Sequence, residues 1–354
     1  MHYLRLLLLP LSLLYGLATW IRNRCYDWGW IKSTSFAKPT IVVGNLAVGG
    51  TGKSPMIEYL VRLLDGKYKL ATLSRGYGRK TRGFREVREG STAVESGDEP
   101  LQFKRKFPHV TVAVAENRVK GVQRLIDSGH DVILLDDAFQ HRALDPGFVI
   151  LLFDYQTLGQ PRWLLPAGNY RDGLWERKRA DLMVVTKTPA AADGKEKERI
   201  RRKLSIGQQV PVLFAGIGYG APVPVLPSSP GIAALDANLS ILLVTGIANP
   251  EPLHQYLSAY VKDILQLRYP DHHPYTSADV QKMVDRFDAL PNPHKLIVTT
   301  EKDAQRLLDP VLRGFLADLP FYMVPIHVRF DGEAEQVLKQ MVSAYCVRTL
   351  ASYQ

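Results

Sequence analysis

The sequence predicts an α/β protein with a doubly wound, mostly parallel sheet, followed by a second, smaller α/β domain. Short apolar runs rich in valine, isoleucine and leucine alternate with segments of helical periodicity, which is typical of strand–helix–strand units. A stretch rich in glycine and proline, at 216–230, divides these runs into two sets. The chain of 354 residues is also long enough for about two domains.

The first element that we expect is an apolar N-terminal helix. Residues 4–20 are almost wholly apolar, and arginines, Trp28 and Trp30 follow them. A run of about 17 residues is at the short limit for spanning a bilayer, so we expect a helix that lies in the membrane interface. Two alternatives stay open: a signal peptide cleaved after Ala18, and a helix buried on the protein's own core.

The strands follow in two sets, because buried parallel strands are near-continuous apolar runs. In the first domain we expect strands at Thr40–Val43, Leu70–Leu73, Val110–Val114, Val132–Leu135, Phe148–Phe153, Leu182–Thr186 and Val212–Ala215. In the second we expect Ile241–Thr245, Ile264–Leu267, Leu296–Thr300 and Phe321–Pro325, before a helix from Glu333. The expected boundaries are 1–34 for the membrane-associating helix and its aromatic flank, 35–219 for the first domain, 220–238 for a linker, and 239–354 for the smaller domain with the C-terminal helix.

A phosphate-binding loop follows the first expected strand. Gly49, Gly50 and Gly52 allow a sharp turn whose N–H groups point at phosphate oxygens, next to the positive end of the following helix. The pattern predicts a P-loop NTPase-type domain that binds ATP, with Lys53 at the β- and γ-phosphates and the Ser54 hydroxyl on Mg²⁺. The chain lacks the first glycine of the usual pattern, and a glycine-rich turn with a solvated lysine is the alternative. The predicted cofactor-binding residues are Gly49, Gly50, Thr51, Gly52, Lys53 and Ser54.

An acidic pair ends another expected strand. Asp136 and Asp137 follow the apolar run 132–135, at the edge where open α/β sheets bind their ligands. Together with the phosphate loop upstream, the pair predicts a magnesium site. A solvated turn after the strand is the alternative.

Further polar residues allow two interpretations each. Arg75 follows the second expected strand and either lies over the phosphates or belongs to a solvated basic loop. Asp98 is either a catalytic carboxylate or, like Ser96, a helix cap. His272 and His273 lie in a turn of the second domain, where one of them could move a proton.

Thr300 and Asp303 form a simpler case. They end one expected strand and begin a helix, three residues apart. Capping-box chemistry explains both residues without any function.

The charge balance favours an anionic partner. The net charge is +10 and the pI is near 9.4, which fits nucleic acid, an anionic lipid surface or a phosphorylated substrate. Cys25 and Cys346 cannot make a disulfide framework, and no Cys/His spacing predicts zinc. A reducing compartment fits this composition.

Taken in order, these motifs resemble one family, the tetraacyldisaccharide 4′-kinases that phosphorylate the lipid A precursor on the cytoplasmic face of the Gram-negative inner membrane. The resemblance covers nearly the whole chain and also accounts for the displaced glycine of the loop. Its motifs are the apolar N-terminal segment, Val43–Asn45, Gly49–Pro55, Leu73–Gly78, Gly97–Pro100, Asn117–Arg118, Asp136–His141, Leu165–Gly168 with Arg171, Asp271–His272 and Thr300–Asp303.

The resemblance implies a role for individual residues. Lys53 and Ser54 would hold ATP and Mg²⁺, with Asp136 and Asp137 completing the metal site. Asp98 is similar to the family's catalytic carboxylate and His272 to its partner in a base dyad, with His273 the neighbouring alternative. The substrate-binding residues that it implies are Arg75, Asn117, Arg118, Gln140, His141 and Arg171. Ser54, Ala138 and residues 169–173 depart from the commoner pattern, which leaves the roles of Arg171 and Asp172 open.

The resemblance also implies the reaction and its setting. The γ-phosphoryl group of ATP would pass to the 4′-hydroxyl of an acylated glucosamine disaccharide 1-phosphate held in the membrane. The protein would lie peripherally on the cytoplasmic face of the inner membrane, with no nucleic acid and no protein partner.

A membrane-associated P-loop ATPase or GTPase switch is the alternative function. Guanine selection needs Asn/Thr-Lys-x-Asp, and the stretch 186–189 lacks that aspartate. A nucleic-acid-dependent ATPase would use the positive charge, but the sequence shows no groove-reading module.

Overall fold

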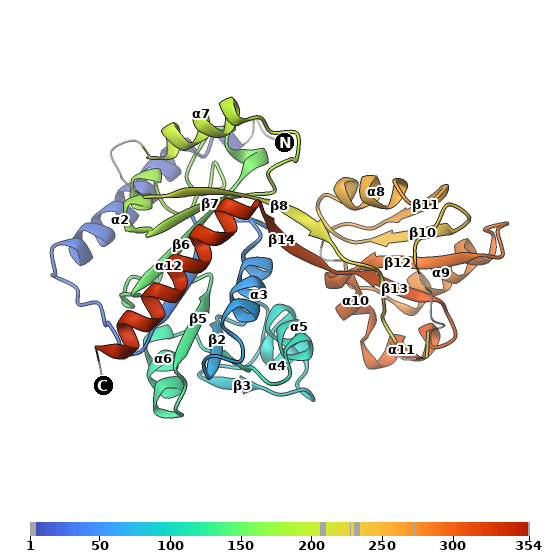
Figure 1. The fold of residues 1–354 in the computed structure, drawn as a ribbon, viewed down its shortest axis with the longest axis horizontal. Coiled ribbons are helices and arrows are strands. Elements are labelled where there is room, and N and C mark those ends of the chain that lie inside the picture. Colours follow the sequence, from blue (N-terminus) through green and yellow to red (C-terminus); the bar gives the residue numbers. More distant parts are fainter. Residues whose placement is uncertain (1–4, 206–209, 227, 230–233, 272, 353–354) are drawn as a thin grey trace. The chain divides into compact units, whose positions relative to one another are not determined.

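The computed structural model describes residues 5–205, 210–226, 228–229, 234–271 and 273–352 (Figure 1). The chain divides into two compact units. The larger unit comprises Met1–Ile217 and Val328–Gln354, and the smaller comprises Gly218–His327. The chain leaves the larger unit within strand β8 (Val212–Tyr219) and returns to it within β14 (Ile326–Phe330).

The larger unit contains a nine-stranded sheet in the order β14-β8-β7-β6-β1-β5-β2-β4-β3. The pairs from β8 to β4 are parallel, and β3 is antiparallel to β4. The remaining strands are β1 (Thr40–Asn45), β2 (Leu70–Ser74), β3 (Arg85–Val87), β4 (Thr111–Val114), β5 (Val132–Asp136), β6 (Phe148–Asp154) and β7 (Leu182–Thr186). The helices are α2 (Leu9–Asp27), α3 (Lys53–Leu64), α4 (Ala93–Ser96), α5 (Asp98–Lys106), α6 (Arg118–Asp127), η1 (Tyr155–Thr157), η2 (Leu174–Arg179), α7 (Gly194–Ser205) and α12 (Gly332–Ala351).

Helices cover both faces of this sheet, which confirms the predicted doubly wound class. One apolar cluster joins the sheet to α3 and α12, and the second joins its other face to α6 and α7. Within the first cluster, Leu338 and Val342 of α12 are fully buried with Ile41 and Val43 of β1.

The position of α12 corrects the expected boundaries. We assigned the C-terminal helix to the smaller domain of residues 239–354, but it packs on the larger unit (Figure 1). The buried side chains of α12 lie on one side of the helix, which packs on the sheet face beside α3: Ala334, Leu338, Val342, Tyr345 and Cys346.

The register of the parallel strands brings one set of loops together. Val43 of β1 is opposite Asp136 of β5, and Asn45 is opposite Leu152 of β6. Because parallel strands end at the same edge, the loop after β1 and the acidic pair after β5 lie side by side.

The smaller unit has its own sheet, in the order β11-β10-β12-β13-β9. All pairs are parallel except β13 with β9. Its strands are β9 (Val223–Pro224), β10 (Ser240–Thr245), β11 (Asp263–Arg268), β12 (Lys295–Thr300) and β13 (Phe321–Val324), and its helices are α8 (Glu251–Ser258), α9 (Ser277–Asp288), α10 (Glu301–Leu307) and α11 (Pro310–Leu316). Strand β9 lies in the stretch expected as a linker, and its Pro224 is tolerated because β9 is an edge strand.

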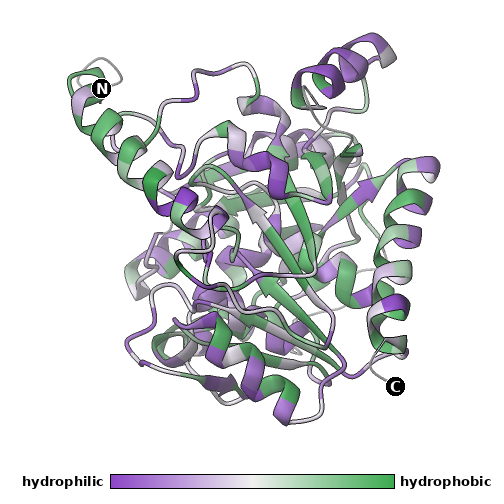
Figure 2. Cartoon of the chain, turned by 90° about the vertical axis from the view of Figure 1, so that its left-hand side faces the viewer, coloured by the Kyte–Doolittle hydropathy of each residue, from purple (hydrophilic) through white to green (hydrophobic). Residues whose placement is uncertain are grey.

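Helix α2 runs along the larger unit, and the residues of its N-terminal half are mostly hydrophobic (Figure 2). Leu13 is 74% exposed and Leu7 is 75% exposed, whereas Ser12, Gly16 and Asn23 are buried. The helix therefore does not pack its leucines on the core, which was one of the alternatives. Among the residues that the structure describes, no helix is long and apolar enough to cross a bilayer.

Candidate active site

The loop between β1 and α3 has the conformation that its glycines predict. Gly49 and Gly52 have φ values of +114° and +83°, in the left-handed region that favours glycine. Gly52 is also the N-cap residue of α3, and glycine has no side chain that could cap the first N–H groups of the helix. These N–H groups are therefore available to an anion at the positive end of the helix.

Lys53, the first residue of α3, points back toward the ends of the neighbouring strands. Its Nζ lies 3.3 Å from the Asn45 Oδ1 atom and 3.9 Å from the Asp137 Oδ1 atom. Asn45 itself is fully buried at the end of β1. The lysine charge is thus held over the glycine-rich loop, where a nucleotide's outer phosphates would lie.

The two carboxylates after β5 differ in protonation behaviour. Burial, helped by the charges of Glu99 and Asp137, raises the pKa of Asp136 to about 7 against the opposing effect of Lys53. Burial acts the same way on Asp137, but hydrogen bonds from Arg171 and the charge of Lys53 outweigh it and lower the pKa of Asp137. A carboxyl group with a raised pKa beside an ionised carboxylate is typical of a cation-binding site.

Arg171 also contacts Asp137, the aspartate that lies near Lys53. Its Nη1 and Nη2 atoms donate to the two carboxylate oxygens of Asp137, at 2.9 and 2.7 Å. It also donates to the side chain and the backbone oxygen of Asn45. Asp137 has a φ of +51°, an uncommon conformation for a residue with a Cβ, so this bidentate pair fixes a strained position.

The other residues that the resemblance implied as substrate-binding lie at the same edge of the sheet. Arg118 is buried, donates to the backbone oxygens of Ala115 and Glu116, and has a pKa lowered by burial to about 10. Gln140 donates to the backbone oxygen of Asn45 at 2.9 Å. Burial, followed by the charges of Arg118 and the exposed Arg75, lowers the pKa of His141.

Asn117 has a structural role that the sequence did not predict. Its side chain caps α6 by accepting a hydrogen bond from the Lys120 N–H at 3.0 Å. This contact accounts for its residue type, since asparagine is among the preferred N-caps.

Asp98 is exposed in the first turn of α5, where Gly97 is the N-cap residue. As the first residue of α5, Asp98 is not the N-cap of that helix, although an acidic side chain in the first turn interacts favourably with the helix's positive end. Ser96 donates instead to the backbone oxygen of Thr92 at the end of α4. Asp98 is therefore an accessible carboxylate in the same unit as the phosphate loop.

The histidine pair is described in part. His272 lies outside the described residues, so its pairing with Asp98 stays a prediction. The ring of His273 lies 3.1 Å from the Asp279 carboxylate and stacks on Tyr269, both within the smaller unit. Thr300 caps α10 by accepting from the Asp303 N–H, as the capping interpretation predicted.

Sequence reasoning missed two residues of the site. Asn45 contacts Lys53, Gln140 and Arg171, and Glu99 lies close enough to Asp136 to raise its pKa. Asn45 could have been found, because a polar residue that ends a buried strand before a phosphate loop has few structural reasons to be there. Glu99 gave no signal of its own beside Asp98.

The buried polar atoms at the loop fit a nucleotide and a cation. Asn45 Nδ2, Thr51 Oγ1 and Asp136 Oδ1 are buried and lack a hydrogen-bond partner among the described residues. Because buried polar groups are normally bonded, this cluster indicates a ligand. The Ser54 hydroxyl and the two aspartates are oxygen ligands, which Mg²⁺ prefers.

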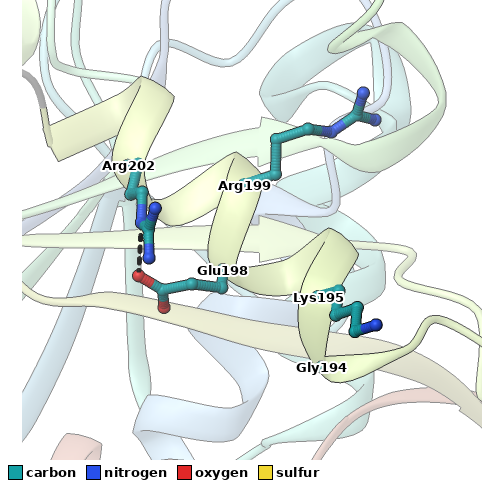
Figure 3. A pocket seen from close by; sticks show the side chains of 5 residues that line it. All are labelled: Gly194, Lys195, Glu198, Arg199 and Arg202. Carbon is teal, nitrogen blue, oxygen red and sulfur yellow. Dashed lines mark hydrogen bonds and ion pairs between the residues drawn. The ribbon is translucent and has the colours of Figure 1, made fainter.

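A separate hollow of about 450 Å³ lies along α7 (Figure 3). Its lining comes from this one helix, and Glu198 pairs with Arg201 at 2.6 Å and with Arg202 at 3.1 Å. Arg199 and Arg202 are each 80% exposed. We assign no ligand to this solvated helix surface.

The chain is similar to known proteins over nearly its whole length. The sequence profile of the family described as tetraacyldisaccharide-1-P 4′-kinase matches residues 4–343. The chain is 42% identical to the tetraacyldisaccharide 4′-kinase of Bacteroides thetaiotaomicron, over 96% of this chain and 92% of that protein. It is 43% identical to the enzyme of that name from Flavobacterium johnsoniae, over 96% and 99%. Its fold is similar to the crystal structure of LpxK from Aquifex aeolicus in complex with ATP, with a TM-score of 0.72, 28% identity, and coverage of 97% and 99%.

Proposed function

The chain belongs to the tetraacyldisaccharide-1-P 4′-kinase family, and we propose that it transfers the γ-phosphoryl group of ATP to the 4′-hydroxyl of an acylated glucosamine disaccharide 1-phosphate in lipid A biosynthesis. The observation that carries this proposal is the convergence of Lys53, Asn45 and Asp137 on one phosphate loop. A phosphoryl transfer needs mainly positioning and charge stabilisation, which such a cluster supplies.

Different groups of the site would contact different parts of the nucleotide's phosphates. The loop amides from Gly49 to Ser54 would bind the phosphate oxygens, and Lys53 would neutralise charge that builds up on the β- and γ-phosphates. Ser54, Asp136 and Asp137 would hold Mg²⁺, which supplies further neutralisation of the phosphate charge when bound. Arg118 interacts electrostatically with Asp136 and Asp137, and Arg75 and His141 interact with Arg118. These three side chains would add positive charge or hydrogen bonds toward an anionic substrate.

Asp98 is the base that we propose for the sugar hydroxyl. It is exposed, it is not the N-cap of its helix, and it lies in the unit that carries the phosphate loop. His272 would act with it, as the resemblance implies. A positioned base contributes about 10²- to 10⁴-fold in such reactions.

The outer side of α2 supports a membrane location. Leu7, Leu13 and Leu14 are 75%, 74% and 64% exposed, and Trp28 and Trp30 follow the helix with 57% and 74% exposure. Leucines on one side of a helix, with tryptophans and arginines at its end, are typical of an interfacial helix. We therefore propose that the protein lies on the cytoplasmic face of the inner membrane and takes its lipid substrate from that surface.

Transfer of labelled phosphate from ATP to the purified lipid disaccharide 1-phosphate in detergent micelles tests the function. We expect label in the lipid that depends on Mg²⁺ and on the lipid. Hydrolysis of ATP at the same rate with and without lipid, and no labelled lipid, would favour a P-loop switch instead.

The base can be tested in the same assay. Asp98→Ala and His272→Ala should each lower kcat by about 10²-fold or more with little change in ATP affinity. The double variant should be barely worse than the poorer single variant, because members of one unit are non-additive. Fully additive losses would contradict a shared base, and Asp285→Ala, at an exposed position of α9, is the control.

A further inference from the structure

Helix α2 has its polar side turned toward the protein. Ser12 and Asn23 are 4% and 2% exposed, although both are polar and their neighbours along the helix are exposed leucines and arginines. Gly16, on the same side, is so close to Leu164 that an added Cβ would lie 2.7 Å from the leucine's Cδ1 atom. A helix that buries polar groups while exposing leucines must use those polar groups in specific contacts, since their burial is otherwise costly.

Outside the N-terminal helix and its cap, the partners of these polar groups belong to one segment, residues 163–173, which we call the 163–173 loop. Ser12 Oγ donates to the Leu164 oxygen at 3.0 Å and accepts from the Ala167 N–H at 2.9 Å. Tyr15 donates to the Arg171 oxygen at 2.9 Å. Asn23 donates to the carboxylate of Asp172 at 3.2 Å, and that carboxylate is 1% exposed. The contacts therefore hold both ends of the loop.

The same loop is bonded to the phosphate loop through the backbone. The Val48 N–H donates to the Asn169 oxygen at 2.7 Å, and the Arg171 N–H donates to the Leu46 oxygen at 2.7 Å. Tyr170 also forms a bridge with Ala47. Residues 46–48 are the first part of the phosphate loop, so their path depends on where the 163–173 loop lies.

Arg171 extends this chain of contacts to the acids. Its backbone is held by Tyr15 and Leu46, and its guanidinium holds both carboxylate oxygens of Asp137. A side chain fixed at its backbone loses less freedom when it orients a partner, and such supporting contacts typically change activity by about 10- to 100-fold when removed.

We propose that α2 is a positioning element of the catalytic site: its polar side fixes the 163–173 loop, and through Arg171 and residues 46–48 that loop fixes Asp137 and the phosphate loop. The positioning rests on these contacts alone. Its effect on catalysis rests also on the proposed function.

The test combines hydrogen exchange with kinetics on the full chain. Tyr15→Phe removes the helix's bond to Arg171, and the double variant Tyr15→Phe/Asn23→Ala also removes the bond to Asp172. Both variants leave the Ser12 bonds and the apolar side intact. We expect faster amide exchange in peptides that contain Val48 and Arg171, because these two N–H groups bond across the two loops. In detergent micelles kcat should fall by about tenfold in the double variant, with KM for the lipid little changed.

The control is Tyr59→Phe, which likewise removes a single hydroxyl; that hydroxyl donates to Glu335 of α12 at 3.1 Å and not to the 163–173 loop. It should leave exchange at Val48 and Arg171 and the micellar kcat unchanged. Arg171→Lys and Arg171→Ala extend the series, because lysine cannot make the bidentate pair and should restore only part of the lost kcat.

Unchanged exchange in a double variant that unfolds at the wild-type temperature would overturn the proposal, whatever its activity. If the double variant does not fold, Tyr15→Phe, which removes a single hydroxyl, decides the matter by the same readout. A wild-type chain that transfers no phosphate would count against the proposed function but not against the positioning, since exchange does not depend on turnover.

Discussion

Asp303 and Asp136 lie at the carboxyl edges of the two sheets and differ in whether their oxygens have hydrogen-bond partners. In the smaller unit, Asp303 is fully buried and its carboxylate accepts from the Gly246 N–H at 2.9 Å, from Thr300 at 2.8 Å and from Arg306 at 3.1 Å. In the larger unit, Asp136 Oδ1 is buried and has no hydrogen-bond partner among the described residues. Burial raises the pKa of Asp136, and Arg171 lowers that of Asp137 against burial.

This difference indicates how a ligand-binding site can be distinguished from polar groups that only stabilise the fold, within one fold class. Parallel sheets concentrate polar side chains at their carboxyl edges whether or not a ligand binds there. Where every oxygen already has a partner, the group stabilises the fold; where oxygens and charges are left over, a ligand completes them. Variants at both edges, each with a matched control, test this distinction.

The largest effect is expected at the carboxyl edge of the larger unit's sheet, where the phosphate loop and Asp136 lie. Lys53→Ala removes the charge that lies 3.9 Å from Asp137, so phosphoryl transfer should fall by about 10³-fold or more. Its melting temperature should stay near that of the wild type, because Lys53 makes no fully buried ion pair. The same change at the exposed Lys195 is the control, measured by label transfer beside a thermal melt. Near-normal turnover of Lys53→Ala would remove the nucleotide assignment.

A substitution at the carboxyl edge of the smaller unit's sheet should lower the stability of the protein but not its catalytic activity. Asp303→Ala leaves Arg306, the Gly246 N–H and Thr300 without their common partner, which should cost about 3 kcal/mol of unfolding free energy. Denaturant unfolding measures this loss, and Asp288→Ala, at an exposed position, should cost little. Binding of ATP should be retained, because the phosphate loop lies in the larger unit. A stable Asp303→Ala protein with abolished ATP binding would contradict the comparison.

The smallest effect concerns pH. The pKa of Asp136 is raised from an ordinary value of 3.8 to about 7, so its ionised form destabilises the metal-free folded protein. Stability should therefore be lost as pH rises from about 4 to about 7, and Asp136→Asn should be more stable than wild type by about 2 kcal/mol at pH 8 without Mg²⁺.

Asp137 supplies the matched control of opposite sign. Its pKa is lowered, because hydrogen bonds from Arg171 and the charge of Lys53 outweigh burial, so its ionised form stabilises the fold. Asp137→Asn should therefore lose stability at pH 8, and the difference should vanish as pH falls below the ordinary range of aspartate. Equal shifts in the two variants, followed by denaturant unfolding across pH, would show that the two acids do not differ.

The sequence predicted those features whose signals lie in consecutive residues. Each expected strand is present, because near-continuous apolar runs are what a sheet buried on both faces requires. The phosphate loop and the acidic pair were predicted because their chemistry lies in consecutive residues. The bidentate contact of Arg171 was not, since it joins residues 34 positions apart that carry no pattern in common.

Two helices show a second limit of sequence patterns. Hydropathy marks α2 as apolar, but only the structure shows that its few polar residues face the protein. The periodicity of the C-terminal segment predicts α12, but not which of two sheets it covers. In both cases the outcome depends on which distant surface is left uncovered, and this is a property of the whole chain.

The place of α12 also has a consequence for how the protein is made. Leu338 and Val342 cover a face of the larger unit whose residues on β1, β5, β6 and α3 are translated before position 218. The smaller unit is synthesised in between, which takes roughly ten seconds on a bacterial ribosome. During that interval the larger unit waits with an apolar sheet face uncovered, so a nascent chain should be bound by chaperones there, and should be released once α12 has emerged.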